Sequence, residues 1–213
     1  MTGGPALDGG GDLLGFSLTV PQSWFEVEVR PGRRDAALRT LVEARVRAQP
    51  ELWEQRAGIT KVLREQARRA WESGAVYCAA LVEPTEAGPV TAAVTISFVA
   101  GPLDASSEDA DRLTPLLERL VVKEAATQDD TWSRPSVAQI GGIGACARTS
   151  GVEDLALPED SGWVRAVVMQ TFVPVPDDRR ILVVTCSSPV LPLAEELLDL
   201  FDAVTSTLHL VGV

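Results

Sequence analysis

The sequence predicts an α+β fold, an antiparallel sheet of about six to eight strands packed by helices. Short runs of alternating apolar residues, typical of strands, occur in both halves of the chain and are separated by clusters of Gly, Pro and Asp. Longer runs with an apolar residue every three or four positions, typical of helices, lie between and after them. The expected order of elements is ββα(α)ββαββββα, in which strands that follow one another can pair antiparallel.

The first two strands are expected in the run GFSLTVPQSWFEVEV, residues 15–29. Apolar residues alternate up to Pro21, and a second alternating run begins at Trp24. Because proline cannot donate to a sheet ladder, Pro21 marks the turn between the two strands. Residues 1–13 are rich in glycine, so we expect a flexible N-terminal tail followed by a single α+β domain over residues 14–213.

A helical segment is expected next, over residues 33–73. The helical pattern begins at Asp35, Pro50 suits the first turn of a second helix, and Gly74 suits its C-cap. Apolar residues recur at helical spacing, first as Leu38, Leu41, Val42 and Val46 and then as Leu52, Ile59, Val62, Leu63 and Trp71. We therefore expect a helical hairpin or one kinked helix with an apolar face.

Charge is divided unevenly between this segment and the rest of the chain. Residues 30–72 carry 11 basic and 6 acidic side chains, whereas the other residues carry 8 basic and 24 acidic ones, for a net charge of −11. A chain this acidic excludes a broad nucleic-acid or anionic-membrane footprint. Arginine accounts for nearly all basic residues, and Ala and Val are plentiful, which fits a GC-rich bacterial source.

The remaining elements follow from alternation, helical spacing and turn residues. Strands are expected over residues 76–82, 90–99, 137–140, 143–149, 163–173 and 181–186. A middle helix is expected from Thr114, with a buried face made of Leu116, Leu117, Leu120 and Val121. Residues 151–162 are expected to form an acidic loop, and a last amphipathic helix is expected from Pro192 to Leu208.

These features resemble the Mog1/PsbP-like fold family, which includes PsbP, Mog1, DcrB-type and LpqN-type proteins. The resemblance rests on the opening FSLTVPQSW, the late strand ILVVTCSSP and the closing helix FDAVTSTLHL, and it would cover residues 14–210. The chain looks like an actinobacterial member with an unusually long basic helical segment. Because the family shares no catalytic residues, the resemblance implies a scaffold for binding partners, and its bacterial members imply a partner linked to the cell envelope or to secretion.

No pattern for catalysis, a metal or a phosphate is found, so we expect no enzyme activity and no cofactor. His209 is the only histidine, and neither Cys146 nor Cys186 has the basic neighbours that would activate its thiol. GIGACA, residues 142–147, fits the permissive dinucleotide pattern but no helical stripe follows, so we interpret it as a turn between strands. The acidic pairs are interpreted as solvated loops: Asp129-Asp130, Glu153-Asp154, Glu159-Asp160 and Asp177-Asp178.

The cysteines and the N-terminus bear on the compartment. Cys78, Cys146 and Cys186 lie in apolar strand-like runs without a CxxC motif, so we expect buried, unpaired thiols that react slowly. The N-terminal residues do not fit a signal peptide, and no run approaches the ~20 apolar residues of a membrane span. We therefore expect a cytoplasmic protein without membrane insertion.

The basic helical segment is the expected partner surface. Most of the five tryptophans are expected to pack against the core, but an exposed Trp53 or Trp71 would lie among arginines, the composition of a binding hot spot. We predict partner binding by Trp53, Arg56, Lys61, Arg64, Arg68 and Arg69.

Two hypotheses for function follow. The first is a non-enzymatic cytoplasmic accessory protein, an adaptor or chaperone-like domain, that binds an unidentified protein with an acidic patch or a second copy of the chain. The second is a small-ligand-binding or hydrolytic protein that uses loop carboxylates in a cleft between the sheet and the helices.

Overall fold

A computed structural model describes residues 15–48, 50, 53–54, 56–85, 88–100, 131–156, 162–175 and 180–211. The predicted tail and the predicted middle helix lie outside these residues, as do the acidic pairs at 129–130, 159–160 and 177–178. The division into a tail and a single domain therefore stays a prediction.

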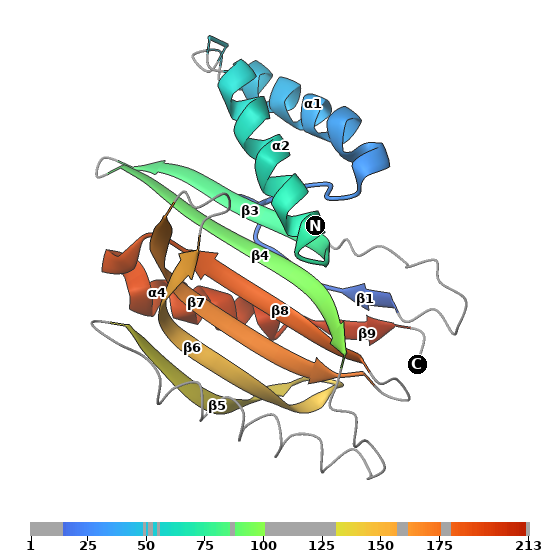
Figure 1. Cartoon of the computed structure of the whole chain (residues 1–213), viewed down its shortest axis with the longest axis vertical. Helices are drawn as coiled ribbons and strands as arrows, with labels where there is room; N and C mark the ends of the chain where they lie inside the picture. The colour runs from blue at the N-terminus through green and yellow to red at the C-terminus, as the bar shows by residue number, and fades with distance from the viewer. Residues whose placement is uncertain are drawn as a thin grey trace.

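The main feature is a twisted seven-stranded sheet (Figure 1). Its strands, in spatial order, are β2 (Phe25–Glu26), β3 (Ala75–Thr85), β4 (Gly88–Ala100), β8 (Arg180–Ser188), β7 (Trp163–Pro174), β6 (Gly144–Ala156) and β5 (Trp132–Ile140). Every neighbouring pair is antiparallel. The predicted α+β class with an antiparallel sheet is thereby confirmed.

A second, two-stranded sheet joins the two ends of the described chain. β1 (Gly15–Ser17) pairs antiparallel with β9 (His209–Val211), and the two strands lie side by side in Figure 1. The predicted turn at Pro21 is present, because the Trp24 N–H donates to the Pro21 carbonyl at 3.0 Å. The strands on either side of this turn belong to different sheets.

Helix α4 (Ala194–Thr205), preceded by a short 3₁₀ turn at Leu191–Leu193, covers one face of the sheet (Figure 1). Its apolar residues pack into the main core together with side chains of β4, β7 and β8: Leu197, Phe201, Val204, Val94, Ile96, Val167 and Val184. The helix ends three residues earlier than predicted. Residues 206–208 form a turn that leads into β9, and Leu208 is fully buried.

The prediction of a loop over residues 151–162 is wrong for its first half, since β6 continues to Ala156. A Cβ at Gly151 would lie 1.9 Å from the Trp132 carbonyl oxygen, so this glycine allows β5 to approach closely. Asp154 accepts two hydrogen bonds from the Arg165 guanidinium on β7, at 2.8 and 3.0 Å. This cross-strand pair explains why acidic residues that look like a loop form a strand.

The glycine-rich GIGACA segment and the cysteines have the predicted structural roles. Gly142, in the turn between β5 and β6, has a φ angle of 78°, and Gly144, the first residue of β6, has one of 104°, so a strand rather than a helix follows. The three cysteines are buried and unpaired, and burial raises the pKa of the Cys146 thiol to about 11. Slow reaction of these thiols stays a prediction.

The predicted basic segment is a hairpin of two helices, α1 (Pro31–Ala48) and α2 (Arg56–Glu72), placed beyond β3 at one edge of the sheet (Figure 1). A second, smaller core holds it there: Val27, Val29, Leu38, Val42, Val46, Leu63, Ala67 and Cys78. The predicted C-cap is confirmed, because Gly74 has a φ of 84° and its N–H donates to the Trp71 carbonyl at 2.9 Å.

Both helices begin at positions other than those predicted. α1 starts at Pro31 rather than Asp35, because proline suits a first turn and the Arg34 guanidinium donates to the Val29 carbonyl at 2.8 Å. α2 starts at Arg56 rather than Pro50. Pro50 instead opens the connection, where its carbonyl accepts from the Trp53 N–H at 3.1 Å.

Candidate functional site

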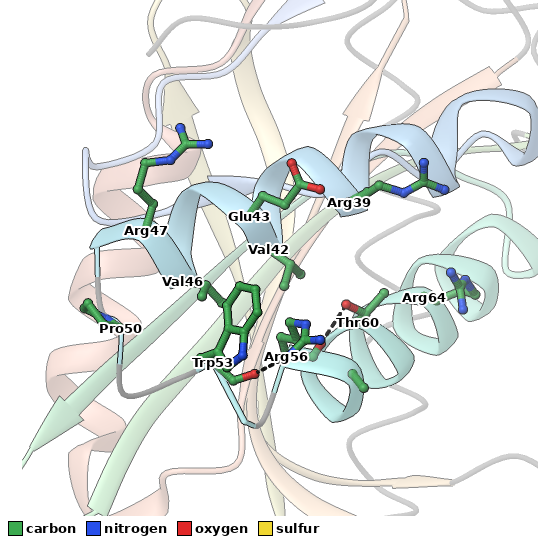
Figure 2. Close-up of a pocket in the computed structure, with 11 residues that line it drawn as sticks. Arg39, Val42, Glu43, Val46, Arg47, Pro50, Trp53, Arg56, Thr60 and Arg64 are labelled. Carbon is green, nitrogen blue, oxygen red and sulfur yellow. Dashed lines mark hydrogen bonds between the residues drawn. The ribbon is translucent and has the colours of Figure 1, made fainter.

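An open groove of about 1030 Å³ lies between α1 and α2 (Figure 2). Its described lining comes from α1, from the connection between the helices and from α2: Arg39, Val42, Glu43, Val46, Arg47, Pro50, Trp53, Arg56, Ala57, Thr60 and Arg64. On each helix, successive lining residues are one, three or four positions apart, so they gather on one side of the helix. The hairpin therefore presents a continuous surface with contributions from both helices.

The floor of the groove is apolar and its rim is charged. Val42 and Val46 are buried, because the same side chains belong to the small core that holds the hairpin on the sheet. Arg39, Glu43 and Arg47 are exposed on the neighbouring turns of α1. Figure 2 shows the two valines pointing toward the space between the helices, with Arg56 and Arg64 on α2 and with Glu43 and Arg47 extending from another side of α1 in this view.

Trp53 is the largest apolar side chain exposed in the groove, at 58% of its surface. The Arg56 guanidinium lies 4.0 Å from the centre of the indole ring and donates to the Trp53 carbonyl at 2.9 Å. Arg56 therefore stacks on one side of the ring and holds it in position (Figure 2). An exposed indole beside an arginine is the composition of protein-binding hot spots.

The arginines of the hairpin differ in how far their charge is neutralised. Within the described residues, Arg39 and Arg47 have no ion-pair partner, and Arg56 contacts Trp53 rather than a carboxylate. The Arg64 Nε lies 2.7 Å from an Asp35 carboxylate oxygen. Glu43 is the one acidic residue among the described lining residues. The groove thus carries an excess of positive charge.

Arg68 and Arg69 are paired on α2 itself. Two guanidinium nitrogens of Arg68 lie 2.5 Å from Glu65 and 2.9 Å from Glu72, and Arg69 lies 3.0 Å from Glu65. The hydrogen bond from Arg68, followed by that from Arg69, lowers the pKa of Glu65 to about 2. Lys61 is exposed, and none of these three basic residues lines the groove.

Of the six predicted partner-binding residues, the structure brings Trp53, Arg56 and Arg64 together in the groove. Sequence reasoning missed the wall that α1 contributes, including Arg39 and Arg47. The available signal was the four-residue spacing from Arg39 through Glu43 to Arg47, which lies beside the buried positions of the helix.

The prediction that most tryptophans pack against the core is wrong. Only Trp24 is buried, while Trp53, Trp71, Trp132 and Trp163 are 58, 42, 39 and 62% exposed. Three of the four exposed rings are stacked by a nearby guanidinium, from Arg56, Arg134 and Arg165. A cation on the ring face lowers the cost of leaving an indole partly in water.

A second cavity of about 450 Å³ lies between β2, the start of α1 and β3. Its carboxylates, Glu26 and Glu28, belong to β2 and the residues after it, not to the acidic loops of the ligand-binding hypothesis. The Tyr77 hydroxyl lies 3.5 Å from Glu26, and burial raises the pKa of this phenol. Burial likewise raises the pKa of the Cys78 thiol to about 12, which favours the protonated form at neutral pH.

Two further features of the described residues bear on function. In the described parts of the chain, no group of three His, Cys, Asp or Glu side chains is placed to hold a metal ion. Among the same residues, no helix has the length and apolar character needed to cross a bilayer. His209 is exposed on β9, whereas Cys146 and Cys186 are buried in the main core.

No protein-family profile matches the chain, and no curated protein matches its sequence. Among solved structures, the chain is similar to the crystal structure of LpqN, which is involved in cell envelope biogenesis of Mycobacterium tuberculosis. The similarity covers 98% of this chain and 91% of LpqN, with 12% sequence identity and a TM-score of 0.48. Membership of the Mog1/PsbP-like family stays a prediction from the sequence, and we infer function from the groove's own side chains.

Proposed function

We propose that this chain is a non-enzymatic protein-interaction domain that binds an acidic segment of a partner protein in the groove between α1 and α2. The observation that carries the proposal is the set of unneutralised arginines around an exposed Trp53. Elsewhere on the hairpin, Arg68 and Arg69 are matched by carboxylates. Arg39, Arg47 and Arg56 are left without a carboxylate among the described residues, and an acidic partner would supply one.

Trp53 and the arginines of the groove would contribute to binding in different ways. Trp53 offers a large, rigid apolar surface, which is the usual source of binding energy at an interface. The arginines attract an acidic partner from a distance and fix its orientation, although each exposed pair contributes only about 0–1 kcal/mol. An adaptor or chaperone-like role in the cytoplasm fits a surface of this kind. The Mog1/PsbP-like resemblance of the sequence favours a partner linked to the cell envelope or to secretion.

The test compares two double variants that remove the same charge. Arg47→Gln/Arg56→Gln acts in the groove, whereas Arg33→Gln/Lys61→Gln removes two cations outside it. Proteins captured from the native host by the wild-type chain would be identified, and the dissociation constant of the purified partner measured for each variant at two salt concentrations. We expect the groove variant to bind about tenfold more weakly and with less dependence on salt.

The control variant should bind the partner within about twofold of the wild type, because exposed cations away from an interface contribute little. A partner that the groove variant retains at unchanged affinity would contradict the proposed function. Equal losses in the two double variants would assign binding to the overall charge of the hairpin and not to the groove.

A further inference from the structure

The α1 wall of the groove carries charges in a fixed order. Arg39, Glu43 and Arg47 follow one another at four-residue intervals, and all three line the groove (Figure 2). Four residues of an α-helix rise by about 6 Å, so the two arginines stand about 12 Å apart with a carboxylate between them. A segment bound parallel to α1 would therefore lie beside a positive charge at Arg39, a negative charge at Glu43 and a positive charge at Arg47.

The α2 wall has a related order. Arg56, Thr60 and Arg64 are also four residues apart, and again the middle residue is not basic. Thr60 donates its hydroxyl hydrogen to the Arg56 carbonyl at 2.7 Å, so it brings no charge to the groove. Both walls therefore have arginines two helical turns apart, with a residue of another kind between them.

Apolar surface lies between the walls. Val42 and Val46 form the floor, and the exposed indole of Trp53 stands at the end nearest the connection between the helices (Figure 2). A third helix laid between two antiparallel helices repeats its side chains with the same period as the walls. It can place apolar residues over the valines and acidic residues beside the arginines at once.

We propose that the occupant of the groove is an amphipathic helix of a partner protein with two acidic residues about two turns apart and a non-acidic residue midway between them. The acidic residues pair with Arg39 and Arg47, and the midway residue faces Glu43. This inference rests on the proposed function and specifies the partner. Glu43 supplies the repulsion that selects one register of the helix, since a carboxylate placed opposite it meets like charge.

Among the described helices, α4 of a second copy does not meet this description. α4 is amphipathic and acidic, with Glu195, Glu196, Asp199 and Asp202 exposed. Its apolar residues are buried in the main core of its own chain, so it cannot present them to a groove without leaving the sheet. The helix that fits the groove is therefore one that is free to expose an apolar stripe.

The test uses two synthetic peptides of about 18 residues, long enough to form a helix. Both carry a leucine stripe and, on one flank, two Glu and one Lys at successive turns. Their composition and net charge are identical, but one has the order Glu–Lys–Glu and the other the order Glu–Glu–Lys. Dissociation constants would be measured by fluorescence anisotropy at low salt with the full chain, its Glu43→Gln variant and the Arg47→Gln/Arg56→Gln variant.

We expect the Glu–Lys–Glu peptide to bind the wild-type chain about tenfold more tightly than its permuted form. Glu43→Gln should reduce this preference several-fold without abolishing it, because Arg39 and Arg47 still favour the Glu–Lys–Glu order, and the double variant should weaken both peptides. Equal affinity of the wild-type chain for the two peptides, a preference that Glu43→Gln leaves undiminished, or no binding of either peptide at about 1 mM would overturn the inference.

The outcomes separate this inference from the proposed function. If the native partner binds the Arg47→Gln/Arg56→Gln variant more weakly but the two peptides bind equally well, the groove binds an acidic partner without selecting one alignment of its helix. In that case only the inference fails. If the native partner is indifferent to both arginines, the proposed function fails. Self-association that Arg47→Gln abolishes would assign the groove to a second copy and contradict both.

Discussion

The two helical regions of the molecule are attached to the sheet in different ways. α4 lies across a sheet face and buries Leu197, Phe201 and Val204 in the main core. The hairpin of α1 and α2 stands at one edge beyond β3 and is held by a separate, smaller core (Figure 1). Removing apolar contacts from α4 should therefore affect the whole sheet, whereas the hairpin can loosen by itself.

Their charged surfaces differ as well. α4 carries acidic residues, and one of them, Asp202, pairs with the buried Arg148 of β6. The hairpin carries arginines that have no carboxylate within the described residues, at Arg39 and Arg47. The comparison shows that, among the described residues, the hairpin outside the main core is the helical region that carries arginines without a carboxylate. The predictions below test this contrast between a scaffold region and a binding region.

The largest effect is expected from Phe201→Ala. Phe201 is fully buried between α4 and the sheet, and loss of a buried phenyl ring costs about 3–5 kcal/mol through lost burial and a remaining cavity. Urea denaturation should show the loss in a single transition. Ala203→Ser, at an exposed position of the same helix, should change stability by less than about 0.5 kcal/mol. A loss below about 1 kcal/mol for Phe201→Ala would contradict the assignment of α4 to the scaffold.

Leu38→Ala tests the hairpin in the same way. Leu38 is 1% exposed in the smaller core, and its truncation should cost about 2–3 kcal/mol. We expect the amides of α1 and α2 to exchange faster with solvent, while those of β6, β7 and β8 keep their rates. Native-state hydrogen exchange followed by mass spectrometry would measure this. Equal acceleration in both regions would show that the hairpin unfolds only with the sheet.

The strands were largely predictable because alternation is a local property of the chain. β3, β4, β7 and β8 overlap the predicted runs. The extension of β6 to Ala156 was not predictable, since it depends on Arg165 of the next strand reaching Asp154. An ion pair between residues on two different strands cannot be inferred from the sequence spacing around either residue.

The candidate site was only partly predictable for a similar reason. The neutralisation of Arg68 by Glu65 and Glu72 follows from spacings of three and four residues on one helix. The groove depends instead on which faces α1 and α2 turn toward each other, and that is decided by their packing around Leu38 and Leu63. Sequence reasoning therefore found one wall of the groove and missed the other.

A smaller effect is expected when the α4 ion pair is broken. The Arg148 side chain is 9% exposed; it donates from Nε to Thr171 at 3.0 Å and pairs with Asp202 through Nη1, while Nη2 has no hydrogen-bond partner among the residues that the structure describes. Asp202→Asn should cost about 1–2 kcal/mol, because a buried cation loses its counter-charge. Arg148→Met in the same background should recover most of this loss in urea denaturation, because it removes the uncompensated charge. No recovery would mean that the guanidinium contributes mainly by packing.

The smallest effect is expected at the exposed ion pairs of α2. Arg68 and Arg69 hold the pKa of Glu65 at about 2, below its value in an unfolded chain. A lowered folded-state pKa means that the pair stabilises the protein above the unfolded pKa, near 4.3, and that this stability is lost as the pH falls toward 2. An NMR titration of the Glu65 carboxyl carbon should show the low pKa directly.

Glu65→Gln gives the matching stability measurement. Its difference from the wild type in urea denaturation should be small at pH 7, since the Glu65 side chain is 38% exposed and solvent screens the pairs. The difference should shrink further between about pH 4 and pH 2, as Glu65 is protonated in the wild type. Glu43→Gln, which breaks no ion pair among the described residues, is the control. If Glu65→Gln also weakened the Glu–Lys–Glu peptide as much as Arg47→Gln/Arg56→Gln does, the separation between paired and unpaired arginines would not hold.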